Sequence, residues 1–339
     1  MINNKLYQIR ANYQGKRKTV NWLKRKKRNK EKRIEKYHDL IKFKQKPYVI
    51  KEAPIDFDFI NNTNEVLKYF NDCGDLFNKK EKVEFDISKI KKLTPDAISL
   101  LVASVNSKKF IKGGLYKGGA PEDPKLKDLF IKSGFYDFVN SRKKLLNPLD
   151  KDHVILHKER DYKVRPRIAK NACLHSLKFL KNASSPKPFE ELYEIMIEAM
   201  QNTNNHASLK NIEKTKWWMY VYNDKENKVS KFCFFDLGVG IFESLVYQNY
   251  IKNLFLELNL ISNSAFVKDL LNGRIQSRVD IDNSIRGKGI PQIVNNAQLD
   301  CFKKFILISN EVKIDLKNKT HVSLDYKFGG TFFYWELKL

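Results

Sequence analysis

The chain has 339 residues, of which 42% are hydrophobic and 12% aromatic, so a mainly disordered polymer is excluded and two domains with a tail are allowed. No stretch approaches the roughly 20 apolar residues that span a bilayer, so no membrane segment is expected. No apolar leader follows the first residues, and the four cysteines lie far apart without metal-ligand spacing. These features predict a cytoplasmic protein.

Residues 1–50 form a basic tail. They hold 17 Lys or Arg and three acids, and so carry +14 of the net charge of +25. The basic residues are densest between Lys24 and Arg33. Because such runs neutralise phosphates and release counterions, the tail indicates contact with nucleic acid or the ribosome. A solvated helix or tail is the alternative interpretation.

Residues 51–145 predict a small α/β domain. Residues 82–88 read as a strand, residues 96–105 as a helix, and residues 125–138 as a second helix that ends near Gly134. This order resembles the STAS domain, the fold of anti-sigma-factor antagonists. The serine that this family phosphorylates lies in a turn before the helix, where this chain has Thr94-Pro95-Asp96-Ala97. The resemblance therefore implies a docking scaffold without a phosphoserine switch.

Residues 146–339 alternate between helical and strand patterns. The charged stretch 150–170 is expected to bridge the two domains. Apolar runs at 304–309, 321–326 and 331–337 predict a final antiparallel series of strands.

The first of four motifs in this region lies on a helix predicted from Phe189 to about Ser208. Glu198, Asn202 and His206 follow at four-residue steps, which places them on one helix face. Asparagine can give a neutral oxygen to Mg²⁺, and a glutamate one turn earlier can orient or deprotonate an attacking group. By itself, the pattern also fits an ordinary polar helix face.

The second motif is the apolar run 232–235, followed by Asp236, Gly238, Gly240 and Ile241. An apolar run of this length predicts a buried strand. An acid directly after it can accept a hydrogen bond from a base amino group, and glycines allow a ligand to approach the backbone. A strand that ends in a simple turn is the alternative.

The third motif is Arg286-Gly287-Lys288-Gly289-Ile290, ahead of a helix predicted over 290–297. Glycines before a helix leave free N–H groups near an anion, and Lys288 adds a positive charge for phosphates. A flexible basic loop would show the same composition.

The fourth motif is Phe328-Gly329-Gly330-Thr331, at the entry to the last predicted strand. Its glycines would let the strand begin beside a ligand, and Thr331 offers a hydroxyl group. An ordinary turn between strands is the alternative.

The ordered combination of the four motifs resembles the ATP-binding domain of the GHKL superfamily, which comprises gyrase, heat-shock chaperones, histidine kinases and mismatch-repair ATPases. The stretch from Glu198 to Ala207 is most similar to the anti-sigma-factor serine kinases. The resemblance implies an α/β chain in which residues 146–339 form a two-layer sandwich of the Bergerat type with a mixed sheet. It also implies ATP or ADP and Mg²⁺ as ligands.

By this resemblance, Asn202 would hold Mg²⁺, Glu198 would act as the catalytic base, and Asp236 would recognise adenine. The other implied contacts surround the nucleotide: Gly238, Gly240 and Ile241 at the base, Gly287, Lys288 and Gly289 at the phosphates, Thr331 at the adenine side, and His206 at the end of the first motif. The superfamily has its lid between the second and third motifs, which corresponds here to about residues 242–288 and includes Arg278.

Three functions remain open at this stage. The chain can be a regulatory ATP-gated switch or slow ATPase that acts on a protein partner, an anti-sigma-type serine or threonine protein kinase, or a nucleic-acid-binding protein modulated by ATP. A histidine kinase is disfavoured because His175, the nearby candidate acceptor, is followed by Ser176 and Leu177 rather than an acid. A homodimer is also compatible with the pattern.

Overall fold

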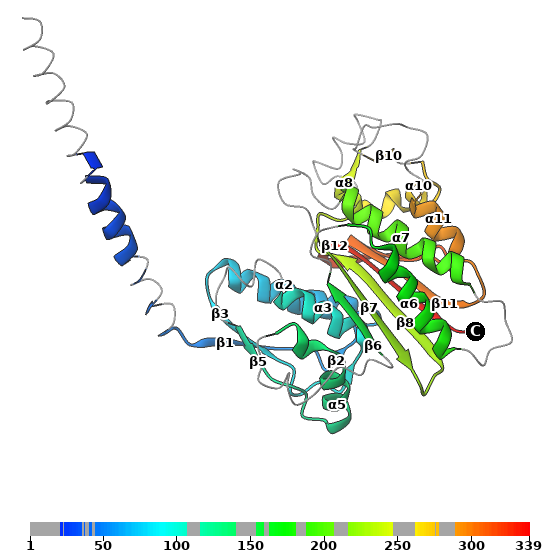
Figure 1. Ribbon diagram of the computed structural model, residues 1–339, viewed down its shortest axis with the longest axis horizontal. Coiled ribbons are helices and arrows are strands. Elements are labelled where there is room, and N and C mark those ends of the chain that lie inside the picture. Colours follow the sequence, from blue (N-terminus) through cyan, green and yellow to red (C-terminus); the bar gives the residue numbers. More distant parts are fainter. Residues whose placement is uncertain are drawn as a thin grey trace, which may run out of the picture.

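The computed structural model describes residues 21–22, 24–35, 37, 41–42, 45–106, 116–139, 154–158, 163–180, 188–206, 216–246, 262–274, 276–277 and 289–339. They form two α/β units that pack together, and a helix that projects away from both (Figure 1). Parallel and antiparallel sheets both occur, so the predicted α/β class is confirmed. Of the helices in these ranges, none has the length and apolar character needed to cross a membrane.

The N-terminal unit (residues 48–139) is built on parallel strands. Its three-stranded sheet has the order β1-β3-β5, and a parallel pair of short strands, β2 and β4, lies beside it. Because β1 pairs with β3 from Tyr48 onward, the folded unit begins just before the boundary expected at residue 51. The strands are β1 (Tyr48–Glu52), β2 (Asp56–Phe57), β3 (Lys82–Asp86), β4 (Lys92–Leu93) and β5 (Tyr116–Gly118).

The helices of the N-terminal unit begin and end at recognisable signals. Pro95 occupies the first turn of α3, a position where proline costs no hydrogen bond. Asp123 caps α5 by accepting hydrogen bonds from the backbone N–H groups of Lys125 and Leu126, and Gly134 ends that region with a φ of 84°. The helices are α2 (Thr63–Asn78), α3 (Pro95–Val105), α5 (Pro124–Lys132) and the 3-10 turn η1 (Phe135–Asp137).

The C-terminal unit (residues 154–339) contains a five-stranded sheet in the order β11-β12-β8-β7-β6. Every neighbouring pair in this sheet is antiparallel, so parallel pairing is confined to the N-terminal unit and the sheet differs from the mixed one expected here. The strands are β6 (Val154–Lys158), β7 (Trp217–Asp224), β8 (Val229–Asp236), β11 (Phe302–Asp315) and β12 (Thr320–Leu337).

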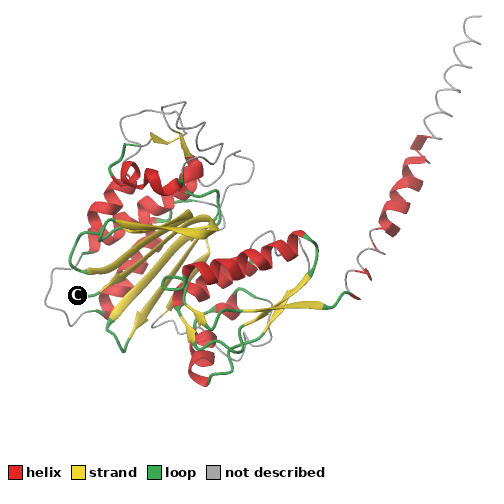
Figure 2. Cartoon of the chain, turned by 180° about the vertical axis from the view of Figure 1, so that it is seen from behind, coloured by secondary structure: helices red, strands yellow, loops and turns green. Residues whose placement is uncertain are grey.

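Helices of the C-terminal unit cover one face of this sheet (Figure 2). The helix α7 contacts β8 and is flanked by α6 and α11. Short elements between β8 and α11 complete this layer. The helical elements are α6 (Pro166–Phe179), α7 (Phe189–His206), α8 (Ile241–Ser244), η3 (Asn263–Phe266), α10 (Val267–Leu271) and α11 (Gly289–Asn296), and the paired short strands are β9 (Leu245–Val246) and β10 (Gln276–Ser277).

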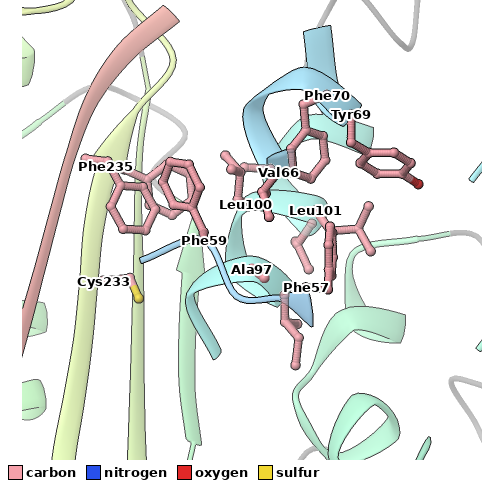
Figure 3. Packing of buried hydrophobic residues seen from close by; sticks show 14 of the residues in the cluster. Phe57, Phe59, Val66, Tyr69, Phe70, Ala97, Leu100, Leu101, Cys233 and Phe235 are labelled. Carbon is pink, nitrogen blue, oxygen red and sulfur yellow. The ribbon is translucent and has the colours of Figure 1, made fainter. Parts of the chain in front are cut away.

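The opposite face of the sheet is covered by the N-terminal unit. Successive side chains of a strand point to opposite faces, so Phe234 joins the core under the helices while Phe235 joins the core shared with the N-terminal unit. Phe59 of the N-terminal unit points toward Phe235 and packs edge-on against Phe332, with ring centroids 4.9 Å apart (Figure 3). The helix α3 is buried along its whole length because it lies between this face and its own unit.

Two predictions about strands need correction. The runs at 321–326 and 331–337 belong to one long strand, β12, so Gly329 and Gly330 lie inside it rather than in a turn. The ladder with β11 shifts register near Asn310, and this irregularity lets a single strand pass the glycines. Within the charged stretch 150–170, residues 154–158 form the edge strand β6 instead of a linker.

Candidate functional site

The first motif lies on α7, whose apolar side is fixed by the sheet. The predicted core face is confirmed, because it is at most 1% exposed and packs beneath the helix layer: Leu192, Ile195, Met196 and Ala199. This packing turns Glu198 and Asn202 toward the rim of the helix, where both are half-buried. His206 is the last residue of α7, and its side chain lies outside the described residues.

The third motif meets the first at Gly289. A Cβ atom on Gly289 would lie 2.7 Å from Oε2 of Glu198 and 3.3 Å from Oδ1 of Asn202. The start of α11 therefore packs directly against these two polar groups, and a larger residue there would displace the Glu198 carboxylate. Gly287, Lys288 and Arg278 lie outside the described residues.

Within the described part of the chain, the polar groups of Glu198 and Asn202 have few hydrogen-bond or charge partners to offset their burial. Burial raises the pKa of Glu198, with a smaller contribution from the neighbouring Glu194 carboxylate. The Nδ2 atom of Asn202 is buried and has no hydrogen-bond partner among the described residues. An unpaired buried amide usually costs about 1–3 kcal/mol, which is typical of a group kept for a ligand.

The second motif centres on Asp236, the last residue of β8, which is 4% exposed. One carboxylate oxygen accepts a hydrogen bond from Thr203 Oγ1 at 3.1 Å, and the other accepts from the Gly238 N–H at 2.8 Å. Burial raises the pKa of Asp236 to about 6, against the opposing effect of these hydrogen bonds. The Thr331 backbone also donates to this carboxylate, and because two oxygens carry four lone pairs, the group can still accept a further hydrogen bond.

The fourth motif packs directly against Asp236. Thr331 is its register partner across the β8–β12 ladder. Gly330 has a φ of +138°, and a Cβ atom there would lie 2.0 Å from the backbone oxygen of Asp236. The strand can therefore pass this point only with glycine, which explains the motif in terms of the backbone alone.

Two residues that sequence reasoning missed shape the Gly238–Ile241 loop. Ser309 Oγ accepts a hydrogen bond from the Ile241 N–H at 2.8 Å, and Asn310 Oδ1 accepts from the Phe242 N–H at 3.1 Å. Asn310 Nδ2 also donates to the Val239 carbonyl at 2.9 Å. The motifs held no signal for these residues, since Ser309 and Asn310 lie about 70 positions further along, where β11 changes register. The approach is so close that a Cβ atom on Gly240, whose φ is +85°, would lie 2.4 Å from Asn310.

A third missed residue is Thr203, next to Asn202 on α7. It is buried, donates to Asp236, and thereby ties the first motif to the second. Its only sequence signal is its position four residues after Ala199, on the side of the helix that faces the sheet.

The region expected to be a lid is partly packed onto the body. Phe242, Phe266, Val267 and Leu270 are at most 4% exposed and belong to the core under the helices. Glu243 forms an ion pair with Lys327 on β12. Of residues 242–288, the segments at 242–243 and 266–270 therefore pack on the body, and β10 pairs with β9.

All four motifs therefore meet at one edge of the α7 layer, although more than 130 positions separate Glu198 from Thr331 in the sequence. The site combines a buried acid, an unpaired amide and closely packed glycines. The described residues hold no cluster of three or more His, Cys, Asp or Glu side chains that could bind a metal alone.

The architecture is that of an α/β protein with a polar site at one rim of an antiparallel sheet. Comparison of the sequence with protein-family models and with curated proteins found no match.

Proposed function

We propose that this protein binds Mg-ATP at the rim of α7 and acts as a regulatory, ATP-gated switch or slow ATPase. The observation that carries the proposal is the convergence of the four motifs on one site. In particular, Gly289 lies against Glu198 and Asn202, and Gly330 and Thr331 lie against Asp236.

The residues at this site suit the two ends of a nucleotide. Asp236 is buried beside glycine backbone and can accept a hydrogen bond from the amino group of adenine where water is excluded. The unpaired amide nitrogen of Asn202 can donate to a phosphate oxygen, and its amide oxygen is a hard ligand of the kind that Mg²⁺ prefers. Magnesium, when bound, would neutralise phosphate charge, with most of its other ligands taken from water and phosphate.

Glu198 is the residue in position to act on a proton. Its carboxylate lies at Gly289, at the start of α11, where backbone N–H groups are free to face an anion. Partial burial raises the pKa of Glu198, and a raised pKa makes a carboxylate a stronger general base. We expect Glu198 to orient or deprotonate the group that attacks the terminal phosphate.

The position of the N-terminal unit favours a switch over phosphorylation within the chain. The start of α3, where the resemblance to STAS domains would have a phosphoacceptor, is occupied by Pro95 and Asp96. Asp96 is 2% exposed and accepts a hydrogen bond from the Ile60 N–H at 3.1 Å. This point lies on the opposite face of the sheet from α7, so Glu198 cannot reach it without the units coming apart.

Calorimetric titration of the full chain with ATP and ADP, with and without Mg²⁺, tests the proposal. We expect binding, and a loss of affinity of about tenfold or more in Asp236→Asn, because the amide side chain offers only one acceptor oxygen. Asp128→Asn on the exposed side of α5 is the control and should bind like the wild type. Absence of binding by the wild type, or wild-type affinity in Asp236→Asn, would sink the proposal.

Incubation with γ-labelled ATP separates a switch from an enzyme. Glu198→Gln should keep nucleotide binding and abolish any phosphate release. Glu190→Gln, in an exposed position on the first turn of α7, is the matched control that should keep release. Label transferred to protein would instead support the kinase alternative.

A further inference from the structure

The most strongly charged surface of the molecule is the helix formed by residues 24–35, which we call the basic helix. All its described side chains are exposed, and it projects away from both units (Figures 1 and 2). Ile34 is the one apolar residue among the twelve. Just before the helix, Trp22 is 57% exposed, and Lys26 Nζ lies 4.9 Å from the centre of its ring.

Six cations of the basic helix form two stripes. One stripe follows steps of three and four residues and contains Arg25, Arg28 and Lys32. The other follows steps of four and three and contains Lys26, Lys30 and Arg33. At 3.6 residues per turn, the two stripes lie about 130° apart on the helix surface. Each is therefore a flank of the helix rather than part of a single basic face.

The remaining residues distinguish the two gaps between the stripes. Asn29 lies between the stripes on the narrower side, where it can offer both a donor and an acceptor. Glu31 and Glu35 stand one turn apart on the wider side, and Lys24 and Lys27 share that side with them. The helix thus has two positive flanks. The narrower side between them is polar and neutral, and on the wider side the positive and negative charges cancel.

We propose that the basic helix binds duplex DNA by lying in the major groove, with one cationic stripe against each phosphate backbone. The major groove is about 12 Å wide and admits one α-helix. In this placement Asn29 faces the base edges, the two stripes face opposite strands, and the two glutamates face solvent. The charge on both flanks matches two phosphate walls, and this complementarity selects the occupant.

Other polyanions fit this helix less well. A helix that lies on an anionic membrane needs a continuous apolar face, which residues 24–35 lack. A flat acidic protein surface would engage one stripe and leave the other in solvent. The major groove of an RNA duplex is deep and narrow, so a helix cannot enter it in the same way.

Binding of the full chain to a fluorescent 20-base-pair duplex at several salt concentrations tests the inference. We expect measurable affinity that falls steeply with salt. Two triple variants each neutralise one stripe. In the first, Arg25, Arg28 and Lys32 are changed to alanine. In the second, Lys26, Lys30 and Arg33 are changed to alanine. Each should weaken binding about tenfold or more and lower the slope of log K against log salt by about 3, since each lost phosphate contact lowers it by about 0.9.

A matched control removes three exposed lysines from the N-terminal unit, Lys79, Lys125 and Lys127→Ala. This control variant should bind DNA like the wild type. That result would show that DNA affinity depends on the two stripes and not on the net charge of the chain. Alanine keeps the helix, and the unfolding temperature of each variant should match that of the wild type because the basic helix projects from the folded body.

Three results would overturn the inference. The first is a loss of binding from only one of the two stripe variants, which would indicate a one-sided surface. The second is affinity for a duplex RNA, a single strand or anionic vesicles equal to or greater than that for duplex DNA. The third is an equal loss in the control variant. Because none of these variants touches the site at α7, the outcome is independent of nucleotide binding.

Discussion

The two faces of the five-stranded sheet are made by alternate residues of the same strands, yet they pack against different parts of the molecule. The face toward α7 ends in a rim where the amide nitrogen of Asn202 is unpaired and glycines allow close packing. The face toward the N-terminal unit is held by a shared apolar core and by hydrogen bonds such as those from Lys304 to Asn61 at 2.9 Å and from Lys313 to Thr63 at 3.1 Å. One face therefore holds the two units together, and the rim of the other carries the polar groups of the proposed nucleotide site.

The two faces also meet at β12. Phe328 packs toward Phe59 of the N-terminal unit, with ring centroids 5.8 Å apart, while Gly330 two residues later touches Asp236. A change at the rim is thus two residues from the interface between the units. This proximity gives a ligand-gated switch a short route from the proposed nucleotide site to the docked N-terminal unit.

The largest effect is expected where the interface is most apolar. Phe59→Ala removes a fully buried ring that packs on Phe328 and Phe332, and should lower the free energy of unfolding by about 3–5 kcal/mol. Ile55→Ala, in an exposed position of the same unit, should cost less than about 0.5 kcal/mol. Urea unfolding followed by tryptophan fluorescence measures both, because every tryptophan except Trp22 lies in the C-terminal unit. An unchanged transition in Phe59→Ala would mean that the units do not share a core.

A slightly smaller effect is expected from the backbone at the rim. Gly330→Ala forces a side chain into a positive φ and onto the Asp236 carbonyl, and should cost about 3 kcal/mol or more. Gly329→Ala is the matched control, because a Cβ atom there meets nothing within 4 Å. Thermal unfolding of the two variants should therefore differ by well over about 5 °C. Equal melting temperatures would contradict the close approach of β12 to Asp236.

The third prediction separates binding from stability. Asn202→Ala should weaken Mg²⁺-dependent ATP binding about tenfold, while unfolding stability stays the same or rises, because the unpaired amide is removed. Asn296→Ala should show the reverse pattern, since its Nδ2 donates to Glu194 at 3.1 Å and fixes α11 on α7. Calorimetry with ATP and thermal unfolding together test the pair. Lower stability in Asn202→Ala would assign that residue a structural role.

The smallest expected effect is on the pH dependence of the free energy of unfolding, to which one buried aspartate on each face of the sheet contributes. Burial raises the pKa of Asp236 at the rim to about 6, and burial with the nearby Asp58 carboxylate raises that of Asp96 at the interface to about 6 as well. An unfolded aspartate has a pKa of about 3.9, so between about pH 4 and pH 6 the folded state binds more protons. Stability from these groups is therefore greatest in acid, falls as the pH rises through the folded pKa, and is level above it.

Asp96→Asn and Asp236→Asn should each remove about 1 kcal/mol of the stability gained between about pH 7 and pH 5. Urea unfolding at the two pH values gives this difference directly, with each variant compared with the wild type. The two losses should add, because the residues lie on opposite faces of the sheet. A wild-type pH dependence in Asp96→Asn would show that this carboxyl group is charged in the folded protein at the lower pH.

Local patterns were sufficient to predict many of the elements. The helix expected from Phe189 is present as Phe189–His206, and the buried run 232–235 lies within β8. The spacing of apolar residues predicted both elements because the helix buries one face and the strand buries both of its faces. Helix α2, in contrast, was not predicted, although its buried residues follow helical spacing; it packs on β1 and β3 of its own unit and on β12 of the other.

Long-range contacts could not be predicted in the same way. No local rule indicates that Asn310 closes the loop after Asp236, or that Thr203, which lies outside the motifs, donates to the Asp236 carboxylate. The expected break between two strands at Gly329 and Gly330 was also wrong, because a glycine can mark the start of a strand or a close approach within one.

The α/β class, the helix that carries Glu198 and Asn202, and the buried strand that ends at Asp236 all follow from the spacing of apolar and polar residues over a few turns, which the chain carries in its sequence. The contacts of Gly289 and Gly330 with those residues, and the burial of the far face of the sheet by the N-terminal unit, became known only from the folded arrangement. Those features depend on which apolar surfaces pack against each other to exclude water, and such surfaces are formed by residues far apart in the chain.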